Sequence, residues 1–508
     1  MYTKNKTFNF FFLKKLIIIF ILLTTALIWS LLMFRYWNYD YSLYYNSAVN
    51  IGDQYRLYKE IFENKGPSYH FFIKNISKII GIGIVQAYIT LALTLFIFFL
   101  SLFFIIFNRS KKHYFLILFL SISILFYQNG NLSLPIFQCG ILILSFYFLL
   151  KRFSENNNIY FYISFFLYSL AFFTKVDVIT YLPVYFIAVA LLYNKKEFIP
   201  KILIIYLFFV IEFTFIYLFF SKYFQFSLYD YYLHNFEFNY QVSGPGRDPF
   251  IKNFRSPVHT GLIMSTGIGI IFIEIFSNVY QKHFTNLKSL FDNKDKEKFI
   301  SLIIIFLGIF FWLWAGSDKN YHVFMIYTPM IFFIAYYWDF LKISRIKLYF
   351  FYIVTIFYSI VTIYAEPKNA IMNGCFLNKT PCGEVIGMAK TINDLKINNY
   401  EDIIVIGNNG WLYLLSNTKP TTAIGDWFFY LKGIKNNKII SEFDTEYLLK
   451  TYEKLLQKKS GYIYWMHKSY IDQLDSKDYY LSSDRIKTML SISTIIEDQG
   501  SYLKLRIK

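Results

Sequence analysis

The sequence has little charge and little cysteine, and it lacks the short motifs of nucleotide and zinc chemistry. Only 17% of its 508 residues are charged, whereas a soluble globular chain usually has about 25%. It contains no P-loop and no Rossmann glycine fingerprint after a strand. Its seven histidines are scattered, without the paired spacing of a zinc site. The sequence therefore gives no support to a soluble nucleotide-dependent or zinc-dependent enzyme.

Apolar and aromatic residues take the place of the missing charge. Hydrophobic residues make up 56% of the chain, with 60 Phe and 46 Tyr, and the mean hydropathy is +0.38. A water-soluble fold of this length cannot bury so many large apolar side chains, but a bilayer solvates them. Many of the residues behind the net charge of +18 lie in short stretches between apolar runs, which indicates membrane topology rather than nucleic-acid binding. We expect a mainly α-helical, polytopic membrane protein.

Apolar runs that can cross the hydrocarbon core, which takes about 17–25 helical residues, recur along the first two thirds of the chain. About eleven runs of this length, or slightly shorter and bounded by polar turns, lie near residues 10–34, 84–107, 114–127, 136–150, 159–173, 178–193, 202–221, 259–280, 299–315, 321–340 and 347–364. The first is longer than the apolar core of a signal peptide and no small-residue cleavage site follows it, so we interpret it as a retained span.

The loops between the runs alternate in basic content. The N-terminus carries Lys4, Lys6, Lys14 and Lys15, and every second loop from there has Lys or Arg clusters: 108–113, 151–158, 194–198, 281–298 and 341–346. The opposite short loops, 128–135, 174–177 and 316–320, have zero, one and one basic residues. This is the positive-inside pattern. It predicts a plasma-membrane (inner-membrane) protein with a cytoplasmic N-terminus, and it places segments 35–83, 222–258 and 365–508 outside.

The chain changes character after the last run. Residues 365–508 have an ordinary charge density and short β-like stretches, with strands predicted within 401–415 and at 461–466 and a helix at 445–459. We expect a transmembrane domain over 1–364 and an extracytoplasmic α/β domain over 365–508, a usual domain size.

The three cysteines have different surroundings. Cys139 lies in an apolar run and is expected to be a packing residue. Cys375 and Cys382 are seven residues apart and have too few neighbouring ligands for a metal site. They form a disulfide if this segment faces an oxidising compartment, and two unrelated thiols are the alternative.

The first outer loop holds the most informative pattern. Asp40 stands just beyond the first apolar run, and residues 41–51 have the spacing of an amphipathic interfacial helix. A polar turn at 52–54 precedes Tyr-Arg-x-x-x-Glu at 55–60, and Lys65-Gly66-Pro67 forces a second turn. The loop thus places a carboxylate and several cations near the lipid headgroups.

This loop resembles the first outer loop of GT-C-type glycosyltransferases, the group of the protein O-mannosyltransferases and the aminoarabinose transferase of lipid A. Residues 171–175 (AFFTK), residues 316–322 (GSDKNYH) with the later Pro329, and the stretch 407–413 are similar to other segments of bacterial members. One departure concerns the acceptor chemistry, because many relatives have Asp-Glu where this chain has Asp40-Tyr41.

The resemblance implies an enzyme whose sugar donor is a polyprenyl-phosphate lipid and whose acceptor is a hydroxyl of a glycan, lipid or protein. It implies a general base at Asp40, inversion at the anomeric carbon, and donor-phosphate or substrate contacts from Arg56, Tyr58, Glu60, Lys65, Lys175, Arg247 and His322. No nucleotide is needed and the sequence indicates no definite cofactor, although a divalent cation between a carboxylate and the phosphate is compatible with it.

Five of these residues also have a plainer interpretation. Asp40 can simply close a span, and Arg56 and Lys65 can be solvated or snorkelling loop charges. Glu60 can pair with Arg56 or Lys59, and a histidine at the start of a span, like His322, is more often structural. The aromatic residues of 222–240 fit an interfacial belt.

Two other functions fit the topology. A transporter or flippase for a lipid-linked glycan would usually show internal repeats and charges deep in its spans. No clear repeat is present, and Glu212 and Glu274 are the main charges of that kind. The second alternative, a non-enzymatic membrane scaffold with an outer binding domain, explains the topology but does not explain the residue pattern of the first outer loop.

Overall fold

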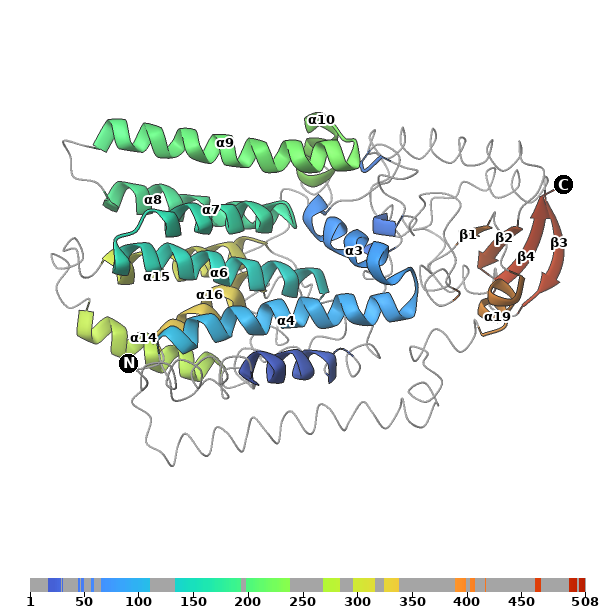
Figure 1. Cartoon of the computed structure of the whole chain (residues 1–508), viewed down its shortest axis with the longest axis horizontal. Helices are drawn as coiled ribbons and strands as arrows, with labels where there is room; N and C mark the ends of the chain where they lie inside the picture. Colours follow the sequence, from blue (N-terminus) through green and yellow to red (C-terminus); the bar gives the residue numbers. More distant parts are fainter. Residues whose placement is uncertain are drawn as a thin grey trace, which may run out of the picture. The chain divides into compact units, whose positions relative to one another are not determined.

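The computed structural model (Figure 1) describes a large part of the chain, and the statements below concern this part. The described residues are 17–28, 30, 44–45, 47–49, 56–58, 65–109, 133–192, 198–237, 268–283, 296–315, 324–337, 389–398, 403–406, 416, 462–466, 493–499 and 502–507. Most of them are helical, as expected for apolar segments whose backbone groups must pair internally in lipid.

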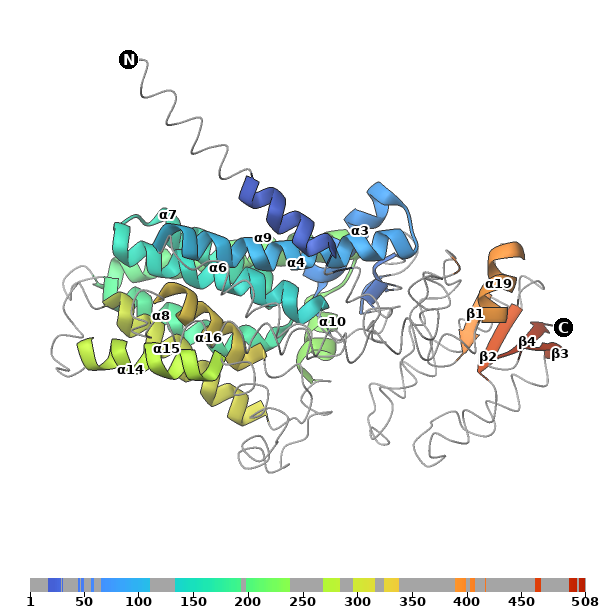
Figure 2. The ribbon, with the colours of Figure 1, turned by 90° about the horizontal axis from the view of Figure 1, so that it is seen from below.

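The apolar helices pack side by side. They are α4 (Ile84–Arg109), α6 (Ser133–Glu155), α7 (Ile159–Phe172), η2 (Val176–Tyr181), α8 (Leu182–Leu192), α9 (Phe198–Phe224), α14 (Ile268–His283), α15 (Lys296–Ala315) and α16 (Phe324–Tyr336). Helix α6 contacts α7, α15 and α16 (Figure 1). Helices α14, α15 and α16 lie together on one side of α6 (Figure 2).

Three of these helices contain segments long and apolar enough to cross a membrane: Val85–Ile105, Leu134–Glu155 and Ile202–Phe224. Shorter apolar helices cover Ile17–Ile28, Ile159–Phe172, Val176–Leu192 and Ile326–Tyr336. The predicted runs at 114–127 and 347–364 lie outside the described residues, and each of the other runs contains described helix. The apolar helices support a membrane protein, while the number of spans and their direction stay predictions.

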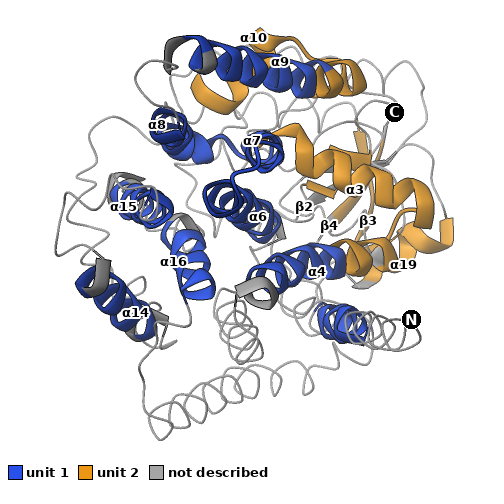
Figure 3. Cartoon of the chain, turned by 60° about the vertical axis from the view of Figure 1, so that its left-hand side comes forward, with its two compact units in different colours: residues 1–33, 91–218, 246–369 blue, residues 34–90, 219–245, 370–508 orange. Residues whose placement is uncertain are grey.

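The chain divides into two compact units (Figure 3). The first comprises residues 1–33, 91–218 and 246–369, and the second comprises 34–90, 219–245 and 370–508. The segments of the second unit largely coincide with the three that the charge pattern places outside, at 35–83, 222–258 and 365–508. This coincidence concerns the sequence ranges alone, and both the topology and the division into domains at residues 364 and 365 stay predictions.

In the first unit, a glycine brings α6 close to α4. A Cβ atom on Gly140 would lie 3.0 Å from the Cα atom of Phe98, so a larger residue would push the helices apart. The Ser101 hydroxyl donates to the Gly140 carbonyl at 2.8 Å. Small residues at helix contacts allow this close approach where lipid provides no hydrophobic drive for association.

A buried hydroxyl cluster joins α6, α7 and α8. The Ser145 hydroxyl donates to the Ser164 carbonyl at 2.8 Å, and the Ser164 hydroxyl returns a bond to the Ser145 carbonyl at 2.7 Å. The Tyr185 hydroxyl hydrogen-bonds to both serine hydroxyls. Polar side chains that pair across apolar helices in this way stabilise a bundle because each satisfies the other.

Helix α9 carries a carboxyl group in the middle of its apolar segment. Both side-chain oxygens of Glu212 are buried, and within the described part of the chain neither has a hydrogen-bond partner. The sequence marks this residue as one of the few acids inside a predicted span. Such an arrangement is costly, because a buried polar group without a partner loses its hydration and gains nothing.

We expect Glu212→Met to raise the free energy of unfolding by about 1–3 kcal/mol, the usual cost of a buried unsatisfied group. Thermal unfolding of the purified full chain in one detergent would measure the change. Glu212→Gln is the matched control, because it keeps the buried polar atoms and should gain less. A less stable Met variant would show that the carboxyl group makes a favourable interaction.

The second unit contains helical segments and a sheet. Helices α3 (Pro67–Ile80) and α10 (Leu228–Tyr232) and the π-helical turn η3 (Leu233–Glu237) belong to residues 34–90 and 219–245 of this unit. Gly66 and Pro67 start α3, since Pro suits the first helical position. Gly81, with φ +90°, ends it. From the sequence, a turn was predicted at Lys65-Gly66-Pro67 and no element was assigned to the residues that follow it, so α3 was missed.

The sheet has four strands in the order β1-β2-β4-β3. β1 (Ile403–Ile406) runs parallel to β2 (Tyr462–Met466), and β4 (Tyr502–Ile507) is antiparallel to β2 and β3 (Ser493–Asp498). β1 and β2 fall within the two predicted strands. The predicted helix at 445–459, the stretch 407–413 and both Cys375 and Cys382 lie outside the described residues.

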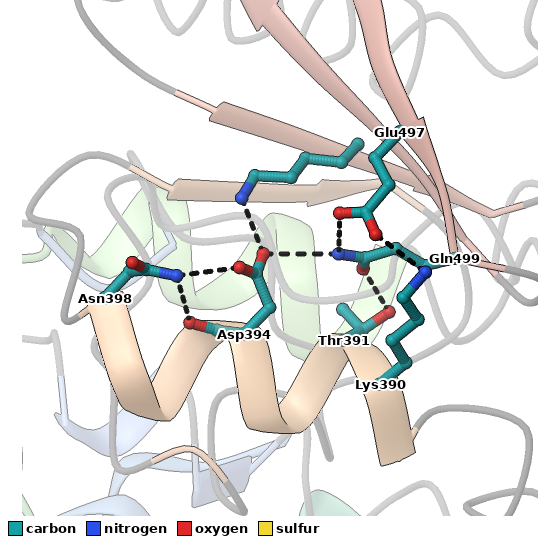
Figure 4. Close-up of polar contacts among 7 residues, drawn as sticks. Lys390, Thr391, Asp394, Asn398, Glu497 and Gln499 are labelled. Atoms are coloured by element: carbon teal, nitrogen blue, oxygen red, sulfur yellow. Dashed lines mark hydrogen bonds and ion pairs between the residues drawn. The ribbon is translucent and has the colours of Figure 1, made fainter.

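Two ion pairs attach α19 (Ala389–Asn398) to the sheet (Figure 4). Lys504 lies 2.7 Å from Asp394, and both side chains are largely buried, at 8% and 15% exposure. Lys390 lies 2.6 Å from Glu497, and this pair is exposed, at 58% and 39%. The hydrogen bonds from Lys390 and from the Gln499 amide hold the pKa of Glu497 below its ordinary value.

Gln499 connects the two pairs. Its amide nitrogen donates to Asp394 and to Glu497, each at 3.2 Å, and its oxygen accepts from the Thr391 hydroxyl at 2.6 Å (Figure 4). The Asn398 amide donates to Asp394 at 2.8 Å. The cluster is therefore a satisfied structural network, which favours one position of α19 on the sheet.

Candidate functional site

Half of the predicted site residues can be placed in the structure. Arg56, Tyr58 and Lys65 belong to the second unit and Lys175 to the first. The other four, Asp40, Glu60, Arg247 and His322, lie outside the described residues.

Tyr58 is the centre of an aromatic cluster in the second unit. Its ring is 2% exposed and lies 5.1 Å from Phe226, 5.4 Å from His234 and 5.7 Å from Tyr231, measured between ring centroids. Its hydroxyl donates to the backbone carbonyl of Lys65 at 2.6 Å. The sequence assigns Tyr58 to substrate contact, and the structure shows a buried residue that touches the main chain of another predicted site residue.

The first loop is tied to the end of α9 by backbone and side chains. The Leu57 amide donates to the Phe224 carbonyl at 3.1 Å. Farther along α3, the ring of Phe71 lies 5.0 Å from that of Tyr223, whose hydroxyl accepts a hydrogen bond from Lys78 at 3.1 Å. Two segments far apart in the sequence, both predicted to lie outside, thus form one structural cluster.

Helix α3 buries a histidine and a lysine on one face. His70 is fully buried and Lys74 is 2% exposed, and because they are four residues apart their side chains share a face. His70 Nδ1 lies 3.1 Å from the Gly66 carbonyl oxygen. Since a carbonyl only accepts, Nδ1 carries the proton of this bond. Neither residue was predicted from the sequence to belong to the site. The sequence signal for them is their spacing of four residues in the stretch after Pro67, which places both on one face of a helix that begins there.

The segment after α9 supplies further buried polar groups. A capping box between Ser227 and Asp230 starts α10, and His234 and Asn235 then follow, 3% and 0% exposed. Burial raises the pKa of Tyr231 above its ordinary value, so its phenol stays protonated. The interfacial-belt interpretation of this segment is therefore incomplete. Exposed residues such as Tyr229 fit it, and the buried ones form the cluster around Tyr58.

The described residues at the start of the first loop are helical, and all of them are buried. Tyr44, Tyr45, Ser47, Ala48 and Val49 are all buried. The Tyr45 hydroxyl accepts a hydrogen bond from the Gly83 amide, and burial raises the pKa of this phenol. The amphipathic pattern of 41–51 correctly predicted helix at these positions. These five side chains are, however, buried by other parts of the protein, whereas an interfacial helix would leave one face to lipid and water.

Lys175 is neutralised within the first unit. Its ammonium lies 2.5 Å from an Asp177 carboxylate oxygen, and both side chains are largely buried. The Gln138 amide donates to the other Asp177 oxygen at 3.0 Å and to the Lys175 carbonyl at 2.9 Å. From the sequence, Lys175 was interpreted as a lone cation in a short outer loop. The structure supplies its counterion, so a phosphate there has to compete with Asp177.

Within the described residues, no group of three or more His, Cys, Asp or Glu side chains has the arrangement of a metal site. The expected positive charge is present in the second unit instead, in the half-buried side chains of Arg56 and Lys65 and the buried Lys74. Cationic side chains of this kind can hold a phosphate by charge and hydrogen bonds.

The fold is similar to that of ArnT. The match is to the crystal structure of ArnT from Cupriavidus metallidurans bound to undecaprenyl phosphate, with a TM-score of 0.55 and 11% sequence identity. It covers 96% of this chain and 97% of that one. No protein-family model and no curated protein sequence matches the chain. The likeness therefore shows a GT-C-like fold over nearly the whole chain, beyond the reach of sequence similarity.

Proposed function

We propose that this protein is a glycosyltransferase that takes a sugar from a polyprenyl-phosphate donor at the outer face of the membrane. The observation that carries the proposal is the ArnT-like fold over 96% of the chain, because the similar structure holds undecaprenyl phosphate. The cluster around Tyr58 supports it as well, since the Tyr58 hydroxyl contacts the main chain of Lys65 and the Tyr58 ring contacts His234 of the segment after α9.

In the proposed reaction the acceptor hydroxyl oxygen attacks the anomeric carbon of the donor sugar. The bond between that carbon and the phosphate oxygen breaks, and polyprenyl phosphate leaves with the electron pair. Asp40 takes the acceptor proton as general base. A single displacement of this kind inverts the anomeric centre.

The leaving phosphate gains negative charge in the transition state, and fixed cations lower the barrier by stabilising that charge. Lys65 and Arg56 are the described candidates for this role. Arg247 and His322 are proposed to bind the donor from other loops, with Glu60 near the acceptor. Lys175 has a smaller proposed part, because its pair with Asp177 offsets its charge. A divalent cation bound together with the phosphate would add to the same stabilisation.

Release of polyprenyl phosphate tests the proposal directly. The purified full chain, reconstituted in sealed lipid vesicles, is given polyprenyl-phosphate hexose together with an extract of the native cell envelope as the source of acceptor. We expect release of polyprenyl phosphate and transfer of labelled hexose to the extract, and no transfer from a nucleotide-linked hexose. Movement of the intact donor across the bilayer without release would indicate the transporter instead, and neither release nor movement would favour the scaffold.

A further inference from the structure

The turn that carries Lys65 is held from two sides by buried side chains. The carbonyls of Lys65 and Gly66 are adjacent in the chain, and each lies within hydrogen-bond distance of a side-chain donor. The Tyr58 hydroxyl donates to the first at 2.6 Å, and His70 Nδ1 donates to the second at 3.1 Å. Tyr58 approaches from the loop before the turn, and His70 approaches from the first turn of α3 after it.

Tyr58 keeps this position at a conformational cost. Its φ angle is +63°, in the left-handed region that bulky residues rarely adopt. Such backbone persists where the surroundings over-determine it, and it occurs preferentially at functional sites. Here the ring is enclosed by Phe226, Tyr231 and His234, and its hydroxyl reaches the main chain of Lys65. Ring packing alone explains a core tyrosine, but it does not explain why the backbone is strained to aim the hydroxyl at this turn.

His70 has a fixed orientation as well. Because its Nδ1 donates to Gly66, the ring cannot flip without losing that bond. The ring also lies edge-on to that of Tyr44, with centroids 6.1 Å apart. The turn between Tyr58 and His70 is therefore restrained at two consecutive carbonyls by two rings that are themselves packed.

We infer that Tyr58 and His70 are positioning residues, which hold the Lys65–Gly66 turn so that the Lys65 ammonium meets the donor phosphate. The inference rests on the proposed function and makes it more specific. Tyr58 also connects Lys65 to the segment after α9, because its hydroxyl contacts Lys65 and its ring contacts Tyr231 and His234. Neither residue has to touch the substrate for this role, and both act through Lys65.

The test compares single and double variants of the full chain in nanodiscs, with polyprenyl phosphate as the binding probe. Lys65→Met should weaken binding by at least tenfold, as expected for a charged hydrogen bond. Tyr58→Phe removes one neutral hydrogen bond and should weaken binding about threefold to tenfold. With polyprenyl-phosphate hexose as substrate, it should raise KM and also lower kcat, because Lys65 stabilises the charge that develops on the leaving phosphate. Tyr229→Phe, at an exposed tyrosine of the neighbouring α10, should behave like wild type.

The double variant separates positioning from general damage to the fold. If Tyr58 acts through Lys65, adding Tyr58→Phe to Lys65→Met should weaken binding no further. The same threefold to tenfold loss in the Lys65→Met background would overturn the inference. Wild-type binding by Lys65→Met alone would instead contradict the role of Lys65 in the proposed function.

His70 provides a second test that does not depend on the stability of the Tyr58 variant. The Asn side-chain nitrogen stands the same number of bonds from Cβ as Nδ1 of histidine. His70→Asn should therefore keep the bond to Gly66 and retain binding, whereas His70→Leu should weaken it by the same factor as Tyr58→Phe. Equal binding by the Asn and Leu variants would show that His70 does not position the turn.

Discussion

Asp40→Asn is expected to lower turnover by about 10²–10⁴-fold, the usual contribution of a general base. The amide has nearly the same shape as the carboxyl group but cannot take the proton of the attacking hydroxyl. Release of polyprenyl phosphate from polyprenyl-phosphate hexose measures the effect. Binding of polyprenyl phosphate should stay close to the wild-type value, because the proposed phosphate contacts are cations elsewhere in the loop.

Asp53→Asn is the matched control, since it removes a carboxylate from the same loop at a predicted turn. We expect this variant to keep its turnover. Asp40→Ala should be as slow as Asp40→Asn, with both proteins folded as judged by thermal unfolding. Full turnover in both Asp40 variants, with an active wild type, would remove Asp40 from the chemistry while leaving the transferase itself in place.

Lys504→Met is expected to weaken the attachment of α19 to the sheet by about 3 kcal/mol, because it leaves Asp394 as a buried carboxylate without its ammonium partner. Hydrogen–deuterium exchange on the full chain measures the change. The amides of residues 389–398 should exchange about a hundredfold faster, since each 1.4 kcal/mol corresponds to a factor of ten in an opening equilibrium.

The same cluster contains its own control. Lys390→Met breaks the exposed pair with Glu497, and we expect almost no change in exchange, because water already screens exposed pairs. Adding Asp394→Asn to Lys504→Met should restore part of the lost protection, since the buried charge is then gone and the one remaining side-chain oxygen can still accept from the amide of Asn398 or of Gln499. Equal increases in exchange for Lys504→Met and Lys390→Met would contradict the idea that the buried pair stabilises the attachment of α19 more than the exposed pair does.

Local pattern was enough to predict the elements. The apolar run at 202–221 predicted α9, and the short runs at 401–415 and 461–466 contain β1 and β2. These predictions succeed because the length and periodicity of apolar residues are properties of neighbouring residues, and a bilayer or a sheet core selects on them directly. Helix α3 was missed because its first residues, Lys65-Gly66-Pro67, indicate a turn as well as a helix start.

The sequence by itself determined the class of the protein, the approximate positions of the described apolar helices of the first unit and the loop in which chemistry is expected. Only the tertiary structure decided which side chains meet. No local pattern pairs Tyr58 with His234, gives the backbone of Lys65 a buried phenol as its donor, or joins Ser145 to Tyr185. Lys175 looked like a lone cation although its partner, Asp177, is two residues away. The physical reason is that hydrophobic spacing fixes which face of an element is buried, whereas partners across elements depend on how those faces pack.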